Sequence, residues 1–591
     1  MAKVDITVEV CGMAGDGTIA AGGMINEAMS LGGYYVLGFD SYPAEIRGFG
    51  RCVTHSRIGS EEISALQDKT HVLISLNDVQ SRSRAPFLQE NGMVFFDSNP
   101  ASYVTEEESL AAVLKTGVKL YGMPFSDLAT QAAGSPRGRN LSALGGFAAV
   151  CGIDPDLFRQ VISNKFESKG PRVLDMNLKS FDAGHEYALE NFSHRLVGLF
   201  KGLEVEKGEK KVMLSGNSAI GKGAVDAGLK LYFGYPITPA TPIMEYLAKA
   251  LPPRGGQVVQ MEDEIASIGA VLGASYAGAR SMTATSGPGF ALMTELITHG
   301  VMAEIPAVIL DAQRGGPSTG LPTKTEQSDL QAAVFGGPGD SARIVIAPTN
   351  VSECYKFTVK SFQLAERYQT PVIVLTDFFL DNRVENVHPP HSTEQELQRL
   401  SVTPDSSKQG DYKRYEDTPD GISPRALPGM KGFNFVATGL EHSQYGAPDY
   451  SPENHQKMSA KRHRKIESAL RDLFKPEEFF DDSEVDLGVI GWGSTFGSVL
   501  EATQEARRKG LKVSALKITS IYPYHAREIR AFMNKCKMIL IPELNFEGHL
   551  ANLIGHLHNS DVFRLNLVTG SPIPPSVIVS EIERLISGGV K

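Results

Sequence analysis

Three consecutive predicted strands each end in residues that could take part in chemistry. The first is followed by the acidic residues Glu262, Asp263 and Glu264, the second by a Ser-Gly-Pro-Gly loop at 286–289, and the third by a loop that contains Arg314. The three strands cover residues 258–259, 281–285 and 307–311. In a parallel sheet, ligands bind at the carboxyl ends of the strands. The pattern therefore predicts one site where a carboxylate, a glycine loop and an arginine meet.

A helix is predicted directly after the acidic cluster at 262–264. Its apolar residues recur at three- and four-residue steps, and small residues between them keep it thin enough for close packing. The apolar positions are Ile265, Ile268, Leu272 and Tyr276, and the small ones are Gly269, Ala270, Gly273 and Ala274. Glu262 and Asp263 are interpreted as the cap and the dipole partner of this helix. Strand, loop and helix alternate in the same way along the chain, which predicts an α/β fold class.

The composition describes an ordinary globular protein of several domains. With 591 residues the chain should hold roughly three or four domains. The net charge of -10 argues against a nucleic-acid or anionic-membrane partner, because both bind basic patches. No apolar run of about 18 residues is present, so no membrane span is predicted. The N-terminal segment is typical of a strand rather than a signal peptide, which favours a cytoplasmic location.

The cysteines do not form a metal-binding motif. The chain has five, and no two lie close enough for a C-x-x-C pair. They are Cys11, Cys52, Cys151, Cys354 and Cys536. No zinc or iron–sulfur site is expected in this chain, and the cysteines are predicted to be buried apolar residues.

The N-terminal block is similar to the first half of a dinucleotide-binding fold. A strand at 5–10 leads into a glycine loop at 12–17 and a helix, and a second strand at 34–39 ends in Asp40. The glycine spacing is G-x-x-G-x-G rather than G-x-G-x-x-G, which disfavours NAD. The glycines suit either an anion at the start of the helix or a tight turn.

An arginine follows the second strand of this block. Arg47 lies in the stretch S-Y-P-A-E-I-R-G-F-G at 41–50. It could face a ligand or pair with Glu45, and the residues alone favour the ion pair.

Two further loops carry glycine, proline and hydroxyl groups. The segment from Gly216 to Gly223 nearly matches a phosphate-binding loop, but Gly223 stands where a Ser or Thr must bind magnesium, which disfavours nucleotide hydrolysis. The proline-rich segment 234–242 is predicted to be extended and to expose Thr238 and Thr241 ahead of a helix.

The predicted domains follow from these blocks. They are an oxidoreductase domain at 1–201, a charged linker at 202–211, a second α/β domain at 212–387, a polar region at 388–483 and a third α/β domain at 484–591. A polar region as long as 388–483 is usually functional or covers a partner. Its basic helix around 461–465 is interpreted as a solvated face.

The blocks together resemble one family, the 2-oxoacid:ferredoxin oxidoreductases, in the form where the gamma and alpha chains are fused. The first block is similar to the gamma domain, through G-x-x-G-x-G and S-Y-P-A-E-I-R-G. The segment 234–242, Glu264 and Arg314 are similar to the alpha chain. The departures are Phe49, where the gamma motif more often has glycine, and Met13-Ala14 in the glycine loop. The resemblance implies a Rossmann-like gamma domain, a thiamine-diphosphate pyrimidine-binding domain and a transketolase C-terminal-like domain.

The resemblance also implies a catalytic role for three residues. Glu264 matches the family's acid by the register E-x-A-x-x-G-A, and a carboxyl at the pyrimidine N1′ favours the imino tautomer that removes the C2 proton. Arg314 matches the arginine that binds the substrate carboxylate, which a bidentate guanidinium suits. Thr238 matches a loop hydroxyl near the substrate carbonyl. The residues implied to contact the cofactor are Tyr235, Pro236, Ile237, Thr238 and Glu264.

Further residues are implied to bind substrate. Ser318 and Thr319 lie in the loop after Arg314, and either Lys324 or Arg343 could bind a second carboxylate, which would favour 2-oxoglutarate. The full implied substrate set is Thr238, Arg314, Ser318, Thr319, Lys324, Arg343 and Arg47.

The chain lacks a diphosphate/magnesium motif and a cysteine cluster. Gly15-Asp16-Gly17 begins like such a motif but has no downstream asparagine at the required distance. By resemblance, Mg²⁺ and a 4Fe–4S cluster belong to a separate beta subunit, the assembly is an (αβ)₂ heterotetramer, and this chain alone is inactive. The implied reaction is the coenzyme A-dependent oxidative decarboxylation of 2-oxoglutarate to succinyl-CoA with reduction of ferredoxin, or the reverse carboxylation of a reductive TCA cycle.

Other functions are open at this point. The same chemistry could act on pyruvate or on branched-chain or aryl 2-oxoacids. A transketolase-like transferase conflicts with the absent diphosphate motif, and a non-catalytic assembly subunit conflicts with Glu264 and Arg314, which have no evident structural role at strand ends.

Overall fold

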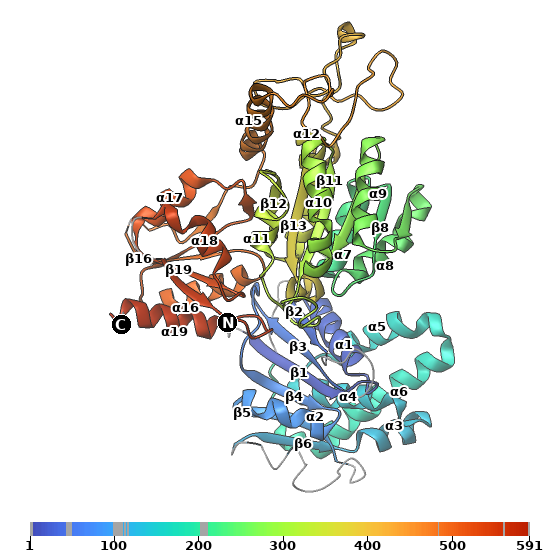
Figure 1. The fold of residues 1–591 in the computed structure, drawn as a ribbon. Helices are drawn as coiled ribbons and strands as arrows, with labels where there is room; N and C mark the ends of the chain where they lie inside the picture. The colour runs from blue at the N-terminus through green and yellow to red at the C-terminus, as the bar shows by residue number, and fades with distance from the viewer. Residues whose placement is uncertain are drawn as a thin grey trace. The chain divides into compact units, whose positions relative to one another are not determined.

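The computed structural model describes most of the chain and has the predicted α/β class (Figure 1). It describes residues 4–42, 50–98, 110, 114, 117–200, 211–482, 484–558 and 562–588. The chain forms two compact units, Met1–Leu214 with Arg383–Pro389, and Ser215–Asn382 with Pro390–Lys591. The predicted linker at 202–211 lies almost wholly outside the described residues. No helix in the described ranges is long and apolar enough to cross a membrane.

The first unit is built on a mixed sheet with the order β6-β5-β4-β1-β3-β2-β14-β7. Its strands are β1 (Asp5–Met13), β2 (Tyr35–Ser41), β3 (Arg51–Gly59), β4 (Thr70–Ser75), β5 (Leu88–Asp97), β6 (Lys119–Met123), β7 (Val212–Ser215) and β14 (Val384–Val387). Its helices are α1 (Thr18–Leu31), α2 (Asp78–Ser81), α3 (Phe125–Ala133), α4 (Arg139–Cys151), α5 (Pro155–Phe166) and α6 (Pro171–Asn191). Strands β1, β4, β5 and β6 are parallel, whereas β3 pairs antiparallel with β1 and β2.

The glycine loop after β1 forms a tight turn. Gly15 and Gly17 have φ values of 98° and 80°, which glycine adopts without steric cost. The Asp16 carboxylate accepts a hydrogen bond from the Met13 N–H at 2.8 Å and pairs with Arg139 at 2.5 Å. The Asp16 carboxylate thus accepts the hydrogen bond from a loop N–H that a bound anion would otherwise accept, which favours the tight-turn interpretation of these glycines.

Strand β14 belongs to the sheet of the first unit, although the predicted second domain included it. Its Val384 lies opposite Gly38 of β2 in an antiparallel pair. The Asn386 side chain fixes this pairing, because it donates to the Tyr34 carbonyl at 2.7 Å and accepts from the Val36 N–H at 2.9 Å. The pairing joins residues about 350 positions apart, so local sequence patterns could not indicate it.

The second unit contains a largely parallel sheet with the order β18-β12-β13-β11-β10-β8-β9. Its strands are β8 (Leu231–Gly234), β9 (Gln257–Gln260), β10 (Ser281–Thr285), β11 (Ala307–Gln313), β12 (Ile344–Ile346), β13 (Pro371–Asp377) and β18 (Ser520–Tyr522). Its helices are α7 (Gly216–Asp226), α8 (Thr241–Ala250), α9 (Glu264–Tyr276), α10 (Gly287–Met302), α11 (Leu330–Phe335), α12 (Val351–Tyr368) and α13 (Phe378–Asn382). Every residue of β10, β11 and β13 is buried, as parallel strands covered on both faces require.

A smaller sheet, β15-β17-β16-β19-β20, completes the second unit. It comprises β15 (Glu477–Phe479), β16 (Val485–Gly491), β17 (Val513–Lys517), β19 (Cys536–Glu543) and β20 (Val562–Asn566), with α16 (Thr495–Arg508), α17 (Ala526–Lys535), α18 (His549–Ile554) and α19 (Pro575–Ile586). One apolar cluster contains Ile309 of β11 together with Trp492 and Ile539. Gln327, in the loop that also carries Arg314, donates to the Trp492 carbonyl and accepts from the Thr495 hydroxyl at 2.6 Å. The small sheet therefore supports the loop of the predicted site.

The predicted phosphate-loop segment is helical. Residues from Gly216 onward form α7, and Lys222 pairs with Asp226 one turn later at 2.7 Å. The segment therefore does not form a phosphate-binding loop. All five cysteines are buried and free, as predicted.

The polar region 388–483 supplies cations to the carboxyl ends of helices in the second unit. Each helix that follows a parallel strand ends at the amino edge of the sheet, where its last carbonyl groups lack helical partners and carry partial negative charge. Four cations of this region donate to carbonyls at or just beyond such helix ends. These contacts are Arg425 to Ser275, Arg399 to Gly278, Arg414 to Glu304, and Lys465 to Gln369. The region thereby supplies hydrogen-bond donors to the carbonyl groups at the carboxyl ends of α9, α10 and α12.

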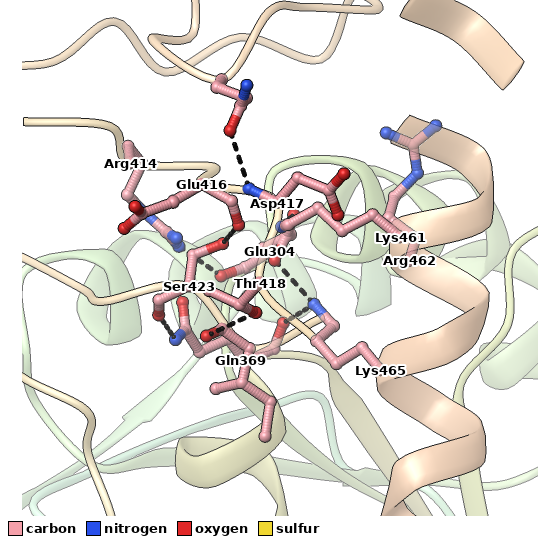
Figure 2. Close-up of polar contacts among 12 residues, drawn as sticks. Glu304, Gln369, Arg414, Glu416, Asp417, Thr418, Ser423, Lys461, Arg462 and Lys465 are labelled. Atoms are coloured by element: carbon pink, nitrogen blue, oxygen red, sulfur yellow. Dashed lines mark hydrogen bonds and ion pairs between the residues drawn. The ribbon is translucent and has the colours of Figure 1, made fainter. Parts of the chain in front are cut away.

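Glu304, just beyond the end of α10, is the centre of this arrangement (Figure 2). Its carboxylate is fully buried and pairs with Lys461 and with Lys465 at 2.9 Å, which lie one turn apart on α15 (Pro452–Ser468). Burial would raise the pKa of Glu304, but the two ammonium charges hold that pKa well below its usual range. Burial lowers the pKa of Lys465 to about 8.

The interpretation of the 461–465 helix as a solvated face is wrong for two of its residues. Lys461 and Lys465 are buried because Glu304 offers both of them a carboxylate inside the protein. That partner lies about 160 residues away, so the charge run alone could not indicate it.

We expect Glu304→Gln to lower the free energy of unfolding of the second unit by about 3–5 kcal/mol, because removal of one partner leaves buried charges unpaired. Urea unfolding followed by the fluorescence of buried Trp492, the chain's single tryptophan, would measure the change. Glu505→Gln, which removes an exposed ion pair with Arg508, is the control and should change little. An unchanged unfolding midpoint for Glu304→Gln would contradict the assigned role.

Candidate active site

Arg314 and Thr238 lie together at the carboxyl edge of the seven-stranded sheet. The Arg314 Nη1 donates to the Thr238 carbonyl oxygen at 2.6 Å. Thr238 lies in the loop between β8 and α8, and the Thr241 hydroxyl holds that loop by donating to the Ile237 carbonyl at 3.0 Å. Tyr235 begins the same loop and is 43 % exposed. Two of the three predicted catalytic residues are therefore in direct contact.

Glu264 is the first residue of α9 and is 7 % exposed. The preceding Asp263 caps the helix, since its Oδ1 accepts from the Ala266 N–H at 2.7 Å. Of the two acids interpreted as cap and dipole partner, Asp263 is therefore the cap. With that N–H satisfied by Asp263, the Glu264 carboxyl is available for another role.

The glycine loop at the start of α10 forms the surface against which Glu264 lies. A Cβ at Gly289 would overlap the Thr285 Oγ1 and the Glu264 Oε1, so only glycine leaves room for the carboxyl there. Ser286, the N-cap residue of α10, is fully buried, and its hydroxyl has no hydrogen-bond partner among the described residues. The loop thus combines a close approach to Glu264 with an unused hydroxyl.

The Arg314 guanidinium is buried but only partly hydrogen-bonded. The residue is 7 % exposed, and its Nε has no partner among the described residues. Burial lowers the pKa of Arg314, whereas the carboxylates of Asp329 and Glu264 raise it. A buried guanidinium with an unused donor is suited to a carboxylate ligand.

The other predicted substrate residues lie in different places. Ser318 and Thr319 are exposed in the loop between β11 and α11. Lys324 lies on the return of that loop and is half-buried, and its carbonyl accepts from the Gly315 N–H at 3.0 Å. Arg47 lies outside the described residues.

The structure does not bring Arg343 to this site. Arg343 directly precedes β12, at the amino edge of the parallel sheet, opposite to Arg314. It is fully buried, and its guanidinium donates to the carbonyls of Gly336 at 2.5 Å and Ser341 at 3.0 Å. Burial lowers its pKa to about 10. Its side chain therefore serves as a hydrogen-bond donor to carbonyls of the turn before β12. The sequence shows only that an arginine precedes a strand, so it could not indicate this role.

Sequence reasoning missed Asp329, which is next to the site. Its carboxyl lies against the first residue of α10, because a Cβ at Gly287 would be 2.7 Å from Oδ2 and 2.9 Å from Oδ1. Its N–H donates to the side chain of Gln313, the neighbour of Arg314, at 3.0 Å. An acid directly before a short helix was the available signal, but that signal alone indicates only a helix cap.

Three family models match the chain in order. Residues 7–187 match "Pyruvate ferredoxin/flavodoxin oxidoreductase", residues 222–461 match "Pyruvate flavodoxin/ferredoxin oxidoreductase, thiamine diP-bdg", and residues 485–571 match "Pyruvate:ferredoxin oxidoreductase core domain II". The segment that carries Glu264 and Arg314 is thus part of a thiamine-diphosphate-binding domain.

Relatives cover nearly the whole chain. It is 30 % identical to 2-oxoacid:ferredoxin oxidoreductase 2, subunit alpha, of Aeropyrum pernix (99 % of this chain, 98 % of the relative), and 31 % identical to 2-oxoglutarate oxidoreductase subunit KorA of Mycobacterium tuberculosis (98 % and 91 %). The solved 2-oxoglutarate:ferredoxin oxidoreductase of Magnetococcus marinus, with 2-oxoglutarate, coenzyme A and succinyl-CoA bound, is similar with a TM-score of 0.92 and 38 % identity (98 % and 99 %). This chain belongs to the 2-oxoacid:ferredoxin oxidoreductase family, which confirms the predicted resemblance.

We expect Gly289→Ala to lower turnover of the assembled enzyme by about 10²-fold, because the added methyl displaces the Glu264 carboxyl and small misplacements cost that much. Steady-state turnover and thiamine diphosphate titration would measure the loss. Gly273→Ala on α9 is the matched control, since a Cβ there meets no atom within 4 Å and should leave both quantities unchanged. Equal activity of the two variants would contradict the role of Gly289.

Proposed function

We propose that this chain is the fused alpha–gamma subunit of a coenzyme A-dependent 2-oxoacid:ferredoxin oxidoreductase that acts on 2-oxoglutarate. One observation carries the proposal. At the carboxyl edge of one sheet, the buried Glu264 carboxyl lies against Gly289. The buried Arg314 guanidinium lies at the same edge, and its Nε has no hydrogen-bond partner among the described residues.

The residues at this edge fit the aminopyrimidine of thiamine diphosphate. Glu264 lies at the entrance of α9 in a low-dielectric setting, and the loop from Tyr235 to Thr238 would hold the ring from the other side. The unused Ser286 hydroxyl offers a further polar group. When bound, thiamine diphosphate supplies the nucleophilic carbon and the electron sink that decarboxylation of a 2-oxoacid requires.

Glu264 would hold a proton toward the pyrimidine N1′. A hydrogen bond from its carboxyl to that nitrogen would favour the imino tautomer of the ring, which would supply a base when the cofactor is bound.

Arg314 would bind the carboxylate of the 2-oxoacid. The Thr238 carbonyl fixes one Nη of the guanidinium, and the free Nε side is left for the substrate. This orientation would place the substrate carbonyl near the Thr238 loop. Binding of the leaving carboxylate by a fixed cation orients it before the bond breaks.

The substrate assignment rests on a second carboxylate and on relatives. Lys324, half-buried in the loop after Arg314, is the candidate cation for the distal carboxylate, and Ser318 and Thr319 lie in the same loop. The names of the Mycobacterium tuberculosis relative and of the Magnetococcus marinus structure support 2-oxoglutarate. Pyruvate is the second candidate, because all three matching family models carry its name.

A separate beta subunit would complete the site with Mg²⁺ and a 4Fe–4S cluster, in an (αβ)₂ assembly that reduces ferredoxin in the cytoplasm. Large apolar side chains on the loops and helices around the site are exposed, as expected of a protein-binding surface. They are Tyr235, Ile265, Leu292, Leu321 and Phe546. The exposed fraction reaches 80 % for Phe546.

We expect Glu264→Gln to lower turnover of the assembled enzyme by about 10²- to 10⁴-fold while the fold is retained, because the amide cannot share a proton with N1′. Reduction of ferredoxin by the complex with its beta subunit would measure this, and circular dichroism would report the fold. The chain without the beta subunit should reduce no ferredoxin. Near-normal turnover of the variant would reject Glu264, and activity of the single chain would reject the division between subunits.

Two substitutions should distinguish the residue that binds the carboxylate next to the substrate carbonyl from the residue that binds the distal carboxylate. Arg314→Lys should lower kcat/KM for both 2-oxoglutarate and pyruvate by about 10- to 100-fold, since a charged hydrogen bond contributes about 1.5–3 kcal/mol. Lys324→Gln should lower kcat/KM for 2-oxoglutarate only. Lys249→Gln, on the exposed surface of α8, is the control. A wild-type preference for pyruvate would replace 2-oxoglutarate as the proposed substrate.

A further inference from the structure

Gln327 lies in the loop between β11 and α11, and its polar atoms bond to the small sheet. The residue is fully buried. Its Nε2 donates to the Trp492 carbonyl at 3.2 Å, and its Oε1 accepts from the Thr495 hydroxyl at 2.6 Å and from the Leu544 N–H at 3.3 Å. Its backbone N–H donates to the Leu544 carbonyl at 2.7 Å, and its carbonyl oxygen accepts from the Asn545 side chain at 3.0 Å. These partners lie just after the carboxyl ends of β16 and β19.

Only an amide side chain matches these partners. The small sheet offers one carbonyl acceptor, at Trp492, and two donors, the Thr495 hydroxyl and the Leu544 N–H. A carboxylate has no proton for the carbonyl, and an apolar side chain of the same length would leave all three groups unpaired inside the protein. The identity of residue 327 therefore fixes how the loop is attached to the small sheet.

The loop that contains Gln327 has little regular structure of its own. Residues 314–329, all of which the structure describes, contain no helix and no strand pairing except one bridge between Gly315 and Leu321. Arg314 is followed directly by two glycines, which adopt a wide range of backbone angles. Local preferences therefore do not fix the direction in which the chain leaves Arg314, and contacts with other segments must do so.

Hydrogen bonds connect the start of the loop to its return. The Gly315 N–H donates to the Lys324 carbonyl at 3.0 Å, and the Gly316 N–H donates to the Glu326 carboxylate at 3.2 Å. Glu326 is buried and directly precedes Gln327 in the chain. Because the two limbs are bonded to each other, a restraint on Gln327 also restrains the two glycines at the start of the loop.

The small sheet holds the return of the loop at a second point. The Thr325 N–H donates to the Gly570 carbonyl at 3.3 Å. Gly570 also lies against the side chain of Lys324, since a Cβ at Gly570 would be 2.9 Å from the Lys324 Cβ. The segment that carries the candidate cation for the distal carboxylate is thus in contact with the small sheet as well.

We propose that Gln327 is a positioning residue for substrate binding. It attaches the loop to the small sheet and thereby orients Arg314 toward the carboxylate of the 2-oxoacid. Gln327 acts through the loop and not through contact with the substrate. The inference rests on the proposed function, in which Arg314 binds that carboxylate.

Two variants loosen this attachment from opposite sides. Gln327→Met keeps the length of the side chain and removes its hydrogen bonds, and Thr495→Val removes one of its partners on α16. Thr503→Val is the matched control, because Thr503 is also buried on α16 and its hydroxyl donates within that helix, to the Val499 carbonyl at 2.8 Å. Each variant is assayed as the holoenzyme with its beta subunit.

We expect Gln327→Met to raise KM for 2-oxoglutarate and for pyruvate by about tenfold, because a displaced loop misplaces the guanidinium that binds the carboxylate common to both. The rise should be smaller in Thr495→Val and absent in Thr503→Val. In all three variants, kcat and the Kd for thiamine diphosphate should stay near the wild-type values, since substrate binding alone is weakened.

A double-variant cycle tests whether Gln327 acts through Arg314. If it does, Gln327→Met should raise KM little further when Arg314 is already replaced in Arg314→Lys, because residues that act together are not additive. Effects on KM that multiply in the double variant would overturn the proposal.

The outcomes separate this inference from the proposed function. Unchanged KM in both Gln327→Met and Thr495→Val, with KM raised in Arg314→Lys, overturns the positioning role alone. A wild-type KM in Arg314→Lys overturns the proposed function and this inference together. A lower kcat with weaker thiamine diphosphate binding, or an equal rise of KM in Thr503→Val, also overturns the positioning role. Should Gln327→Met not fold, the comparison of Thr495→Val with Thr503→Val decides.

Discussion

The direction of the helices in the largely parallel sheet separates two kinds of charge. Each helix that follows a strand begins at the carboxyl edge with unpaired N–H groups and ends at the amino edge with unpaired carbonyls. Acids occupy the first edge, where Asp263, Glu264 and Asp329 each lie at or beside a helix start. Cations occupy the other edge, where arginines and lysines donate to helix carbonyls. Because of this separation, acids lie near the N–H groups of helix starts and cations lie near the carbonyl groups of helix ends, and both arrangements are electrostatically favourable.

Helix α10 connects the two edges and explains why the polar region bears on the site. Its first turn carries Gly287 and Gly289, against which Asp329 and Glu264 lie. Its far end leads to Glu304, which Arg414 and two lysines of the polar region hold. A helix of 16 residues behaves as a stiff rod, so fixing one end restrains the position of the other. The region at 388–483 therefore has a structural role in the same unit as the candidate site.

Much of the fold and part of the site could be predicted because they depend on local patterns. Apolar periodicity gives the helices, and the loops after predicted strands give the carboxyl edge where Glu264, Arg314 and Thr238 lie. The lysines of α15 and the strand β14 could not be predicted, because their partners lie about 160 and 350 residues away. Arg343 shows the same limit, since its side chain satisfies a turn at the opposite edge of the sheet.

The sequence by itself determined the α/β class, the family and which strand ends carry an acid, a glycine loop and an arginine. These features depend on residue spacing, and spacing along a strand or helix fixes the side on which a residue lies. Only the tertiary structure decided that Glu264 lies against Gly289, that Asp329 lies against Gly287 of the same turn, and that Glu304 is paired inside the protein. Burial and distance set the state of these charges, and both arise only when segments far apart in the chain come into contact.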